Sequence, residues 1–155
     1  MTGRIAKRLA ELGITLPKPP APVASYVPTV ITGNLIFVSG QVCLDAKGQM
    51  ITGKVGADLD LEQAKAAARA CGLATLAQLN AALGDLDRVV RCVKLTGFVN
   101  AVPDFRDHPK VINGASDLMF EVFGEAGRHA RAAVGAGSLP LNTSVEVDSI
   151  FEITA

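Results

Sequence analysis

The 155-residue sequence has no tryptophan, one tyrosine and six phenylalanines, and its fifteen basic residues balance fifteen acidic ones. Proteins that bind nucleic acid by charge need a basic surface, and stacking on bases needs aromatic side chains. A chain with zero formal net charge and so few aromatic residues offers little of either. We therefore expect no nucleic-acid partner.

Long apolar runs and a targeting segment are also missing. No stretch reaches the roughly 18 apolar residues of a membrane-spanning helix. The first residues, MTGRIAKRLAELGITLP, carry scattered charges and lack the apolar block of a signal peptide. We expect no membrane association and a cytoplasmic location.

Cysteine is scarce and poorly arranged for cross-linking. Cys43, Cys71 and Cys92 are odd in number, far apart and form no CxxC pair, and neither histidine is near them in the sequence. Disulfide frameworks use an even number of cysteines, and zinc sites use closely spaced ligands. We expect three buried structural thiols and no metal site.

The length and the 49% of hydrophobic residues predict a single domain over residues 1–155, large enough to have its own core. Residues 2–12 have the pattern of a short amphipathic helix, capped by Thr2 and ended by Gly13. The following LPKPPAPVAS is too rich in proline for a helix and predicts an extended arm. Residues 1–25 are thus expected to form an N-terminal helix and a proline-rich arm.

A hairpin and a long helix are expected next. Gly33 and Asn34 separate two β-branched runs, which predicts strands at 30–32 and 35–39. After a turn-rich segment, Asp60 and Gln63 have the spacing of a capping box ahead of an alanine-rich helix that ends at Gly84.

Later elements alternate between strand and helix. LDRVVRCVKLTGFVNA predicts a central strand, and apolar spacing from 111 to 123 predicts a second helix with Pro109 in its first turn. Gly114 inside this helix costs about 1 kcal/mol, which indicates close packing, a ligand or a later helix start. Two strands joined by a loop complete the order β-β-α-β-α-β-β. We predict an α+β sandwich, with two helices on one face of a mixed sheet.

The last two predicted strands, within 129–153, carry charges among small and apolar residues. Because side chains alternate along a strand, Glu146 faces away from the side that packs on the helices. His129 and Arg131 share a face and could project to the side of Glu146, and strand order decides whether they meet. One interpretation is an exposed cross-strand ion pair worth about 0.2–1 kcal/mol. The other is a guanidinium that binds a carboxylate with two hydrogen bonds beside a glutamate that handles a proton.

Four segments spanning most of residues 26–153 resemble the reactive intermediate deaminase family, also called the YjgF or endoribonuclease L-PSP family. They are YVPTVITGNLIFVSGQV, GDLDRVVRCVKLTGFVNAVPDF, VINGASDLMFEVFG and HARAAVGAGSLPLNTSVEV. The N-terminal helix, the arm and the longer segment NAVPDFRDHPKVING indicate a longer subgroup. The resemblance implies a chorismate-mutase-like fold and a homotrimer with clefts between subunits. It also implies cofactor-free hydrolysis of enamines or imines, such as 2-aminoacrylate, to 2-oxo acids and ammonia.

The resemblance assigns roles to individual residues. Arg131 matches the arginine that binds the substrate carboxylate, and Glu146 matches the glutamate that positions the attacking water. Ala133 stands where many members have a cysteine, so a thiol contact to substrate is absent at that pocket position. His129 is a further pocket candidate from its predicted face. The other pocket residues that the resemblance implies are Tyr26, Ser39, Gly40 and Asn113.

Three functions stay open. An imine or enamine deaminase requires Arg131 and Glu146 in one cleft. A non-catalytic protein that binds a small carboxylate metabolite, or regulates a partner enzyme, requires Arg131-dependent binding without turnover. A ribonuclease is disfavoured by the composition. Ser39 has no histidine and aspartate at the spacing of a Ser-His-Asp hydrolase, which we therefore do not expect.

Overall fold

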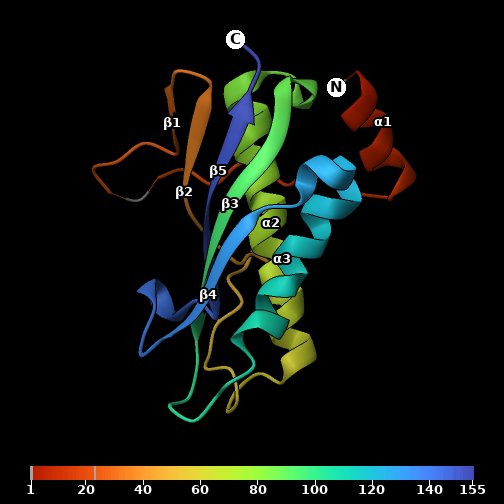
Figure 1. Ribbon diagram of the computed structural model, residues 1–155. Helices are drawn as coiled ribbons and strands as arrows, with labels where there is room; N and C mark the ends of the chain where they lie inside the picture. The colour runs from red at the N-terminus through yellow and green to blue at the C-terminus, as the bar shows by residue number, and fades with distance from the viewer. Residues whose placement is uncertain (1, 23) are drawn as a thin grey trace.

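The computed structural model describes residues 2–22 and 24–155, so Met1 and Val23 of the predicted N-terminal region lie outside the described residues. Short 3-10 turns occur at Leu86–Arg88, Gly124–Gly127 and Pro140–Asn142. The helices and strands, labelled in Figure 1, are α1 (Arg4–Glu11), β1 (Thr29–Thr32), β2 (Leu35–Val42), α2 (Leu61–Leu83), β3 (Val89–Asn100), α3 (His108–Phe123), β4 (Ala130–Ala136) and β5 (Val145–Ile153).

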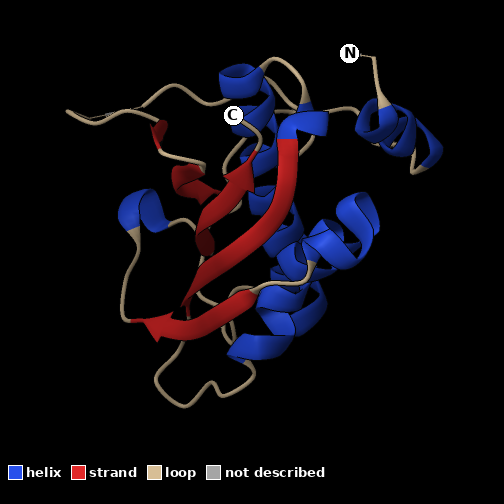
Figure 2. Ribbon diagram, turned by 45° about the horizontal axis from the view of Figure 1, so that its top comes forward, coloured by secondary structure: helices blue, strands red, loops and turns tan. Residues whose placement is uncertain are grey.

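The strands form one mixed sheet in the order β1-β2-β5-β3-β4. Only the β3–β4 pair is parallel within this sheet, and the other neighbours are antiparallel. Helices α2 and α3 lie side by side on one face of the sheet, while strands β1 to β5 present their other face away from them (Figures 1 and 2). The predicted α+β class, element order and two-helix layer are confirmed.

Helix α2 begins with the predicted capping box. The Asp60 carboxylate accepts from the Gln63 amide at 2.8 Å, and the Gln63 side chain accepts from the Asp60 amide at 2.9 Å. Helix α3 starts at His108, so the late start considered for Gly114 is wrong. A Cβ on Gly114 would overlap the carbonyl oxygen of Lys65 on α2. Close packing of α2 against α3 therefore explains this glycine.

The core lies between the helical layer and the sheet. Alternate residues of β5 point into it, as the strand parity predicts. All three cysteines are buried, which confirms their predicted structural environment. None of the helices in the described residues combines the length and hydropathy that a membrane crossing requires. The inward-facing side chains of β5 are Val145, Val147, Ser149, Phe151 and Ile153.

Helix α1 is present, but its predicted cap is wrong. The N-cap position is Gly3 rather than Thr2. The carboxylate of Asp87, which follows α2 in the chain, instead accepts hydrogen bonds from the amides of Arg4 at 2.8 Å and Ile5 at 2.7 Å. First-turn amides have no partner inside a helix, so any nearby carboxylate can satisfy them. Here the partner is distant in sequence, and a local pattern does not reveal it.

Candidate active site in two halves

A cleft of about 1000 Å³ lies on the sheet face that the helices leave uncovered; we call it the outer cleft. Its walls come from β2, β3 and β5, the proline-rich arm and the 3-10 turn at Pro140–Asn142. The side chain of Gln78 on α2 donates to the carbonyl of Pro20 at 2.7 Å and so ties the arm to the body of the protein. Four predicted site residues line this cleft: Tyr26, Ser39, Gly40 and Glu146.

A break in the β2–β5 pairing shapes the cleft floor. The register shifts between Val38 and Gln41, so Ser39 and Gly40 form a bulge. A Cβ on Gly40 would lie 2.8 Å from Oε1 of Glu146, which is too close for an ordinary contact. The absence of a side chain at Gly40 therefore leaves room for the Glu146 carboxylate.

Glu146 has surroundings that favour the protonated form of its carboxyl. Its carboxyl is half-buried, and burial, together with the negative charge of Asp148, raises the pKa of this carboxyl above its usual value. A raised pKa makes this carboxylate a stronger base toward a water molecule bound beside it.

Ser39 and Tyr26 have different surroundings. The hydroxyl of Ser39 donates to the carbonyl of Val27 at 2.7 Å, so its proton is already committed to a backbone acceptor. That geometry suits a structural or binding group rather than a nucleophile, which needs an adjacent base. Tyr26 is 47% exposed at the cleft wall and is free to contact a ligand.

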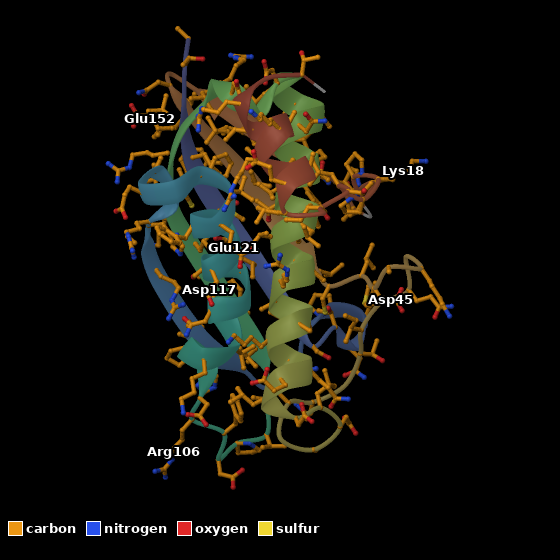
Figure 3. All side chains as sticks on the ribbon, turned by 90° about the vertical axis from the view of Figure 1, so that its right-hand side faces the viewer. Lys18, Asp45, Arg106, Asp117, Glu121 and Glu152 are labelled. Atoms are coloured by element: carbon orange, nitrogen blue, oxygen red, sulfur yellow. The ribbon has the colours of Figure 1, made fainter. Side chains whose placement is uncertain are left out.

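A second polar group, which we call the arginine cluster, consists of Asn113, Ser116, His129 and Arg131 between α3 and β4. Nη1 of Arg131 donates to Oδ1 of Asn113 at 2.7 Å and to Oγ of Ser116 at 3.1 Å. Ser116 Oγ lies 2.9 Å from Nε2 of His129. Figure 3 looks onto this side of the molecule, where α3 runs beside β4 and the labelled Asp117 directly follows Ser116 in the chain.

The structure overturns the predicted placement of His129 and Arg131 on the side of Glu146. Strand β4 pairs in parallel with β3, and Arg131 stands opposite Leu95, which is buried beneath the helices. Glu146 stands opposite Phe98, on the outer face. Directly paired residues share a face of the sheet, so Arg131 and Glu146 project to opposite sides. Parity groups residues within one strand, but only the pairing register relates one strand to another.

The remaining predicted residues fall on the arginine side. Asn113 contacts Arg131 directly, and Ala133, two residues along β4, pairs with Gly97 on the same helix-facing side. Ser116 was not predicted. It lies one helical turn after Asn113, so its i, i+3 spacing would have placed it on the same helix face.

Metal binding has no support in the described part of the chain. Residues 2–22 and 24–155 contain no group of three His, Cys, Asp or Glu side chains that could hold a metal ion. The outer cleft and the arginine cluster contain polar and charged groups suited to moving a proton and to binding a carboxylate, respectively.

Comparison with known proteins identifies the family of this chain. Residues 6–153 match the family described as YjgF/chorismate mutase-like, putative endoribonuclease. Over 153 residues the chain is 50% identical to protein TCP17 of Trypanosoma cruzi, covering 98% of this chain and 96% of that protein. It is 30% identical over 143 residues to the 2-iminobutanoate/2-iminopropanoate deaminase of Dermatophagoides farinae, covering 90% and 94%. The crystal structure of protein Atu1372, of unknown function, from Agrobacterium tumefaciens has a TM-score of 0.88 and 52% identity, covering 97% and 94%. The chain therefore belongs to the reactive intermediate deaminase, or YjgF, family.

Proposed function

We propose that this protein hydrolyses reactive 2-imino acids and their enamine forms to 2-oxo acids and ammonia. The reaction takes place between subunits of a homotrimer, where the arginine cluster of one chain faces the outer cleft of the next. The relative from Dermatophagoides farinae, named a 2-iminobutanoate/2-iminopropanoate deaminase, supports this substrate class.

The observation that carries the proposal is the separation of Arg131 and Glu146 on opposite faces of one sheet. A carboxylate receptor and a proton acceptor in one chain cannot meet across the sheet. In a closed ring each chain presents one patch to its left neighbour and another to its right neighbour. Such a ring joins the two half-sites at every interface.

The uncovered sheet face supports the same assembly. It exposes large apolar side chains beside the outer cleft, including Phe37, which is 40% exposed, and Val30, which is 52% exposed. Contiguous apolar surface of this kind marks interaction sites more often than free surface.

The proposed reaction needs no cofactor. Arg131 binds the substrate carboxylate, which fixes the carbon of the protonated imine close to a water held by Glu146. Glu146 accepts a proton as the water oxygen attacks that carbon and the C=N π electrons move to nitrogen. The carbinolamine nitrogen then takes the proton from Glu146, the C–N bond breaks, and the hydroxyl oxygen becomes the carbonyl. The hydroxyl proton leaves with ammonia as ammonium.

Turnover is tested directly by generating an imino acid with an amino-acid oxidase and following its decay with and without pure protein. We expect acceleration by the wild type, and its loss in Arg131→Ala and in Glu146→Gln. Lys94 also lines the outer cleft and is the alternative cation for the substrate carboxylate. If Lys94→Ala removes turnover and Arg131→Ala does not, the carboxylate binds to Lys94 and the two-chain site is wrong.

Subunit mixing tests the shared site. Trimers formed from equal amounts of Arg131→Ala and Glu146→Gln chains regain about one quarter of wild-type activity if each site takes one residue from each of two chains. The same two variants kept in separate trimers, then combined without exchange, serve as the control. No recovery after verified exchange would contradict the shared site.

A protein that binds 2-oxobutanoate through Arg131 but never accelerates imine decay would instead be the non-catalytic carboxylate-binding protein. That outcome overturns the enzymatic proposal while leaving the arginine half-site intact.

A further inference from the structure

The arginine cluster forms a chain of hydrogen bonds in which the first direction is fixed by chemistry and the second depends on the tautomer of His129. A guanidinium only donates, so Ser116 Oγ accepts from Arg131 Nη1. The Ser116 hydroxyl proton then has His129 Nε2 as its neighbour at 2.9 Å. For Nε2 to accept that proton, it must carry none of its own.

The other ring nitrogen gives the same answer independently. His129 Nδ1 lies 2.7 Å from the carbonyl oxygen of Gly127, which can only accept. Nδ1 therefore carries a proton, and in a neutral ring Nε2 is then free to accept from Ser116. Burial and, less strongly, the positive charge of Arg131 lower the pKa of His129, against the opposing effect of the Gly127 carbonyl. The chain of donors runs from Arg131 through Ser116 to His129 and ends on the backbone.

This chain leaves one edge of Arg131 available. Nη1 carries two hydrogens, and Asn113 and Ser116 take both. The Nε and Nη2 hydrogens make no hydrogen bond to any residue of the described chain. These two nitrogens form a fork that matches the two oxygens of a carboxylate.

We propose that Ser116 and His129 are positioning residues that hold the guanidinium of Arg131 with its Nε–Nη2 edge toward the substrate carboxylate. The inference rests on the proposed function only for the identity of the ligand. The hydrogen-bond chain itself is a property of the single protein and can be measured without turnover.

The first test is the tautomer of His129, from long-range ¹H–¹⁵N NMR spectra of the uniformly ¹⁵N-labelled protein at neutral pH. We expect a neutral ring with its proton on Nδ1. A proton on Nε2, or a doubly protonated ring, would overturn the inference because Ser116 could not then donate to the ring. The only other histidine, His108, provides a reference signal assigned through His108→Gln.

The second test separates binding from chemistry. Ser116→Ala and His129→Phe should each raise KM for the imino acid about 10-fold while kcat changes little. The first variant removes a hydrogen bond to the guanidinium, and the second removes the acceptor that orients the Ser116 hydroxyl. His129→Gln should restore most of the wild-type KM, since its amide oxygen can accept from Ser116. The matched controls Ser138→Ala and His108→Gln should leave KM unchanged.

The same variants are tested for binding of 2-oxobutanoate by calorimetry, so the result does not depend on catalysis. If the wild type binds this probe but does not turn over imines, the proposed function fails, and a roughly 10-fold weaker Kd in Ser116→Ala still supports the positioning role. Unchanged KM and Kd in both Ser116→Ala and His129→Phe overturn it. A wild-type protein that neither turns over imines nor binds 2-oxobutanoate also overturns it, because Arg131 then holds no carboxylate.

Discussion

Replacing Gly40 by alanine should separate stability from activity. A Cβ at this position would lie 2.8 Å from Oε1 of Glu146, whereas ordinary contacts begin near 3.4 Å, so the carboxylate must move by several tenths of an ångström. The obstructing atoms belong to the end of a flexible side chain rather than to backbone, so the fold can yield. Gly40 is not among the residues of positive φ, which means alanine brings no backbone strain.

The expected magnitudes follow from these contacts. Alanine restricts the unfolded chain and stabilises a compatible site by about 0.4–1 kcal/mol, which offsets part of the cost of moving Glu146. Thermal stability should therefore stay close to that of the wild type. A displacement of about 1 Å in a positioned group can lower the rate about 100-fold, so the smaller shift here should cost about 10- to 100-fold in kcat.

The assay combines a denaturant melt with initial rates of imine hydrolysis. Gly137→Ala is the matched control, because no described atom lies within 4 Å of its Cβ position and its φ is not positive. That variant should match the wild type in both measurements. A folded Gly40→Ala protein with wild-type kcat would refute the reasoning, because Glu146 would then tolerate displacement without loss of function.

Two further predictions concern charge and strain on the same face. Asp148→Asn removes a negative charge that raises the pKa of Glu146. Because Glu146 must be ionised to accept a proton, the acid limb of the pH–rate profile should move to lower pH. An acid limb at the wild-type position would contradict this prediction. Leu141→Asn should raise the free energy of unfolding by about 1 kcal/mol in urea, because asparagine tolerates the left-handed region better than leucine. Leu141 is held at φ 56° and is 70% exposed, so little burial is lost. A variant less stable than the wild type would contradict this prediction.

Local sequence signals predicted the elements well where the physical cause is local. The capping box at Asp60 and Gln63 sets the start of α2 because a helix start is decided within one turn. The cap of α1 was missed because its donors are satisfied by Asp87, which the chain brings there only on folding. For Gly114, the sequence revealed the loss of helix propensity. It did not reveal that the carbonyl of Lys65 on α2 leaves no room for a side chain there.

The sequence by itself determined which residues are candidates for the chemistry and how side chains alternate within each strand. It could not determine which face of the sheet each strand turns toward the helices, because that depends on pairing between strands far apart in the chain. The parallel register of β4 on β3 turns Arg131 toward α3, and the antiparallel register of β5 turns Glu146 outward. The tertiary structure also joins Arg131, Ser116 and His129 in one chain of hydrogen bonds. The spacing of these residues in the sequence does not reveal that chain. Tertiary structure alone decided that Arg131 and Glu146 lie on opposite faces of the sheet.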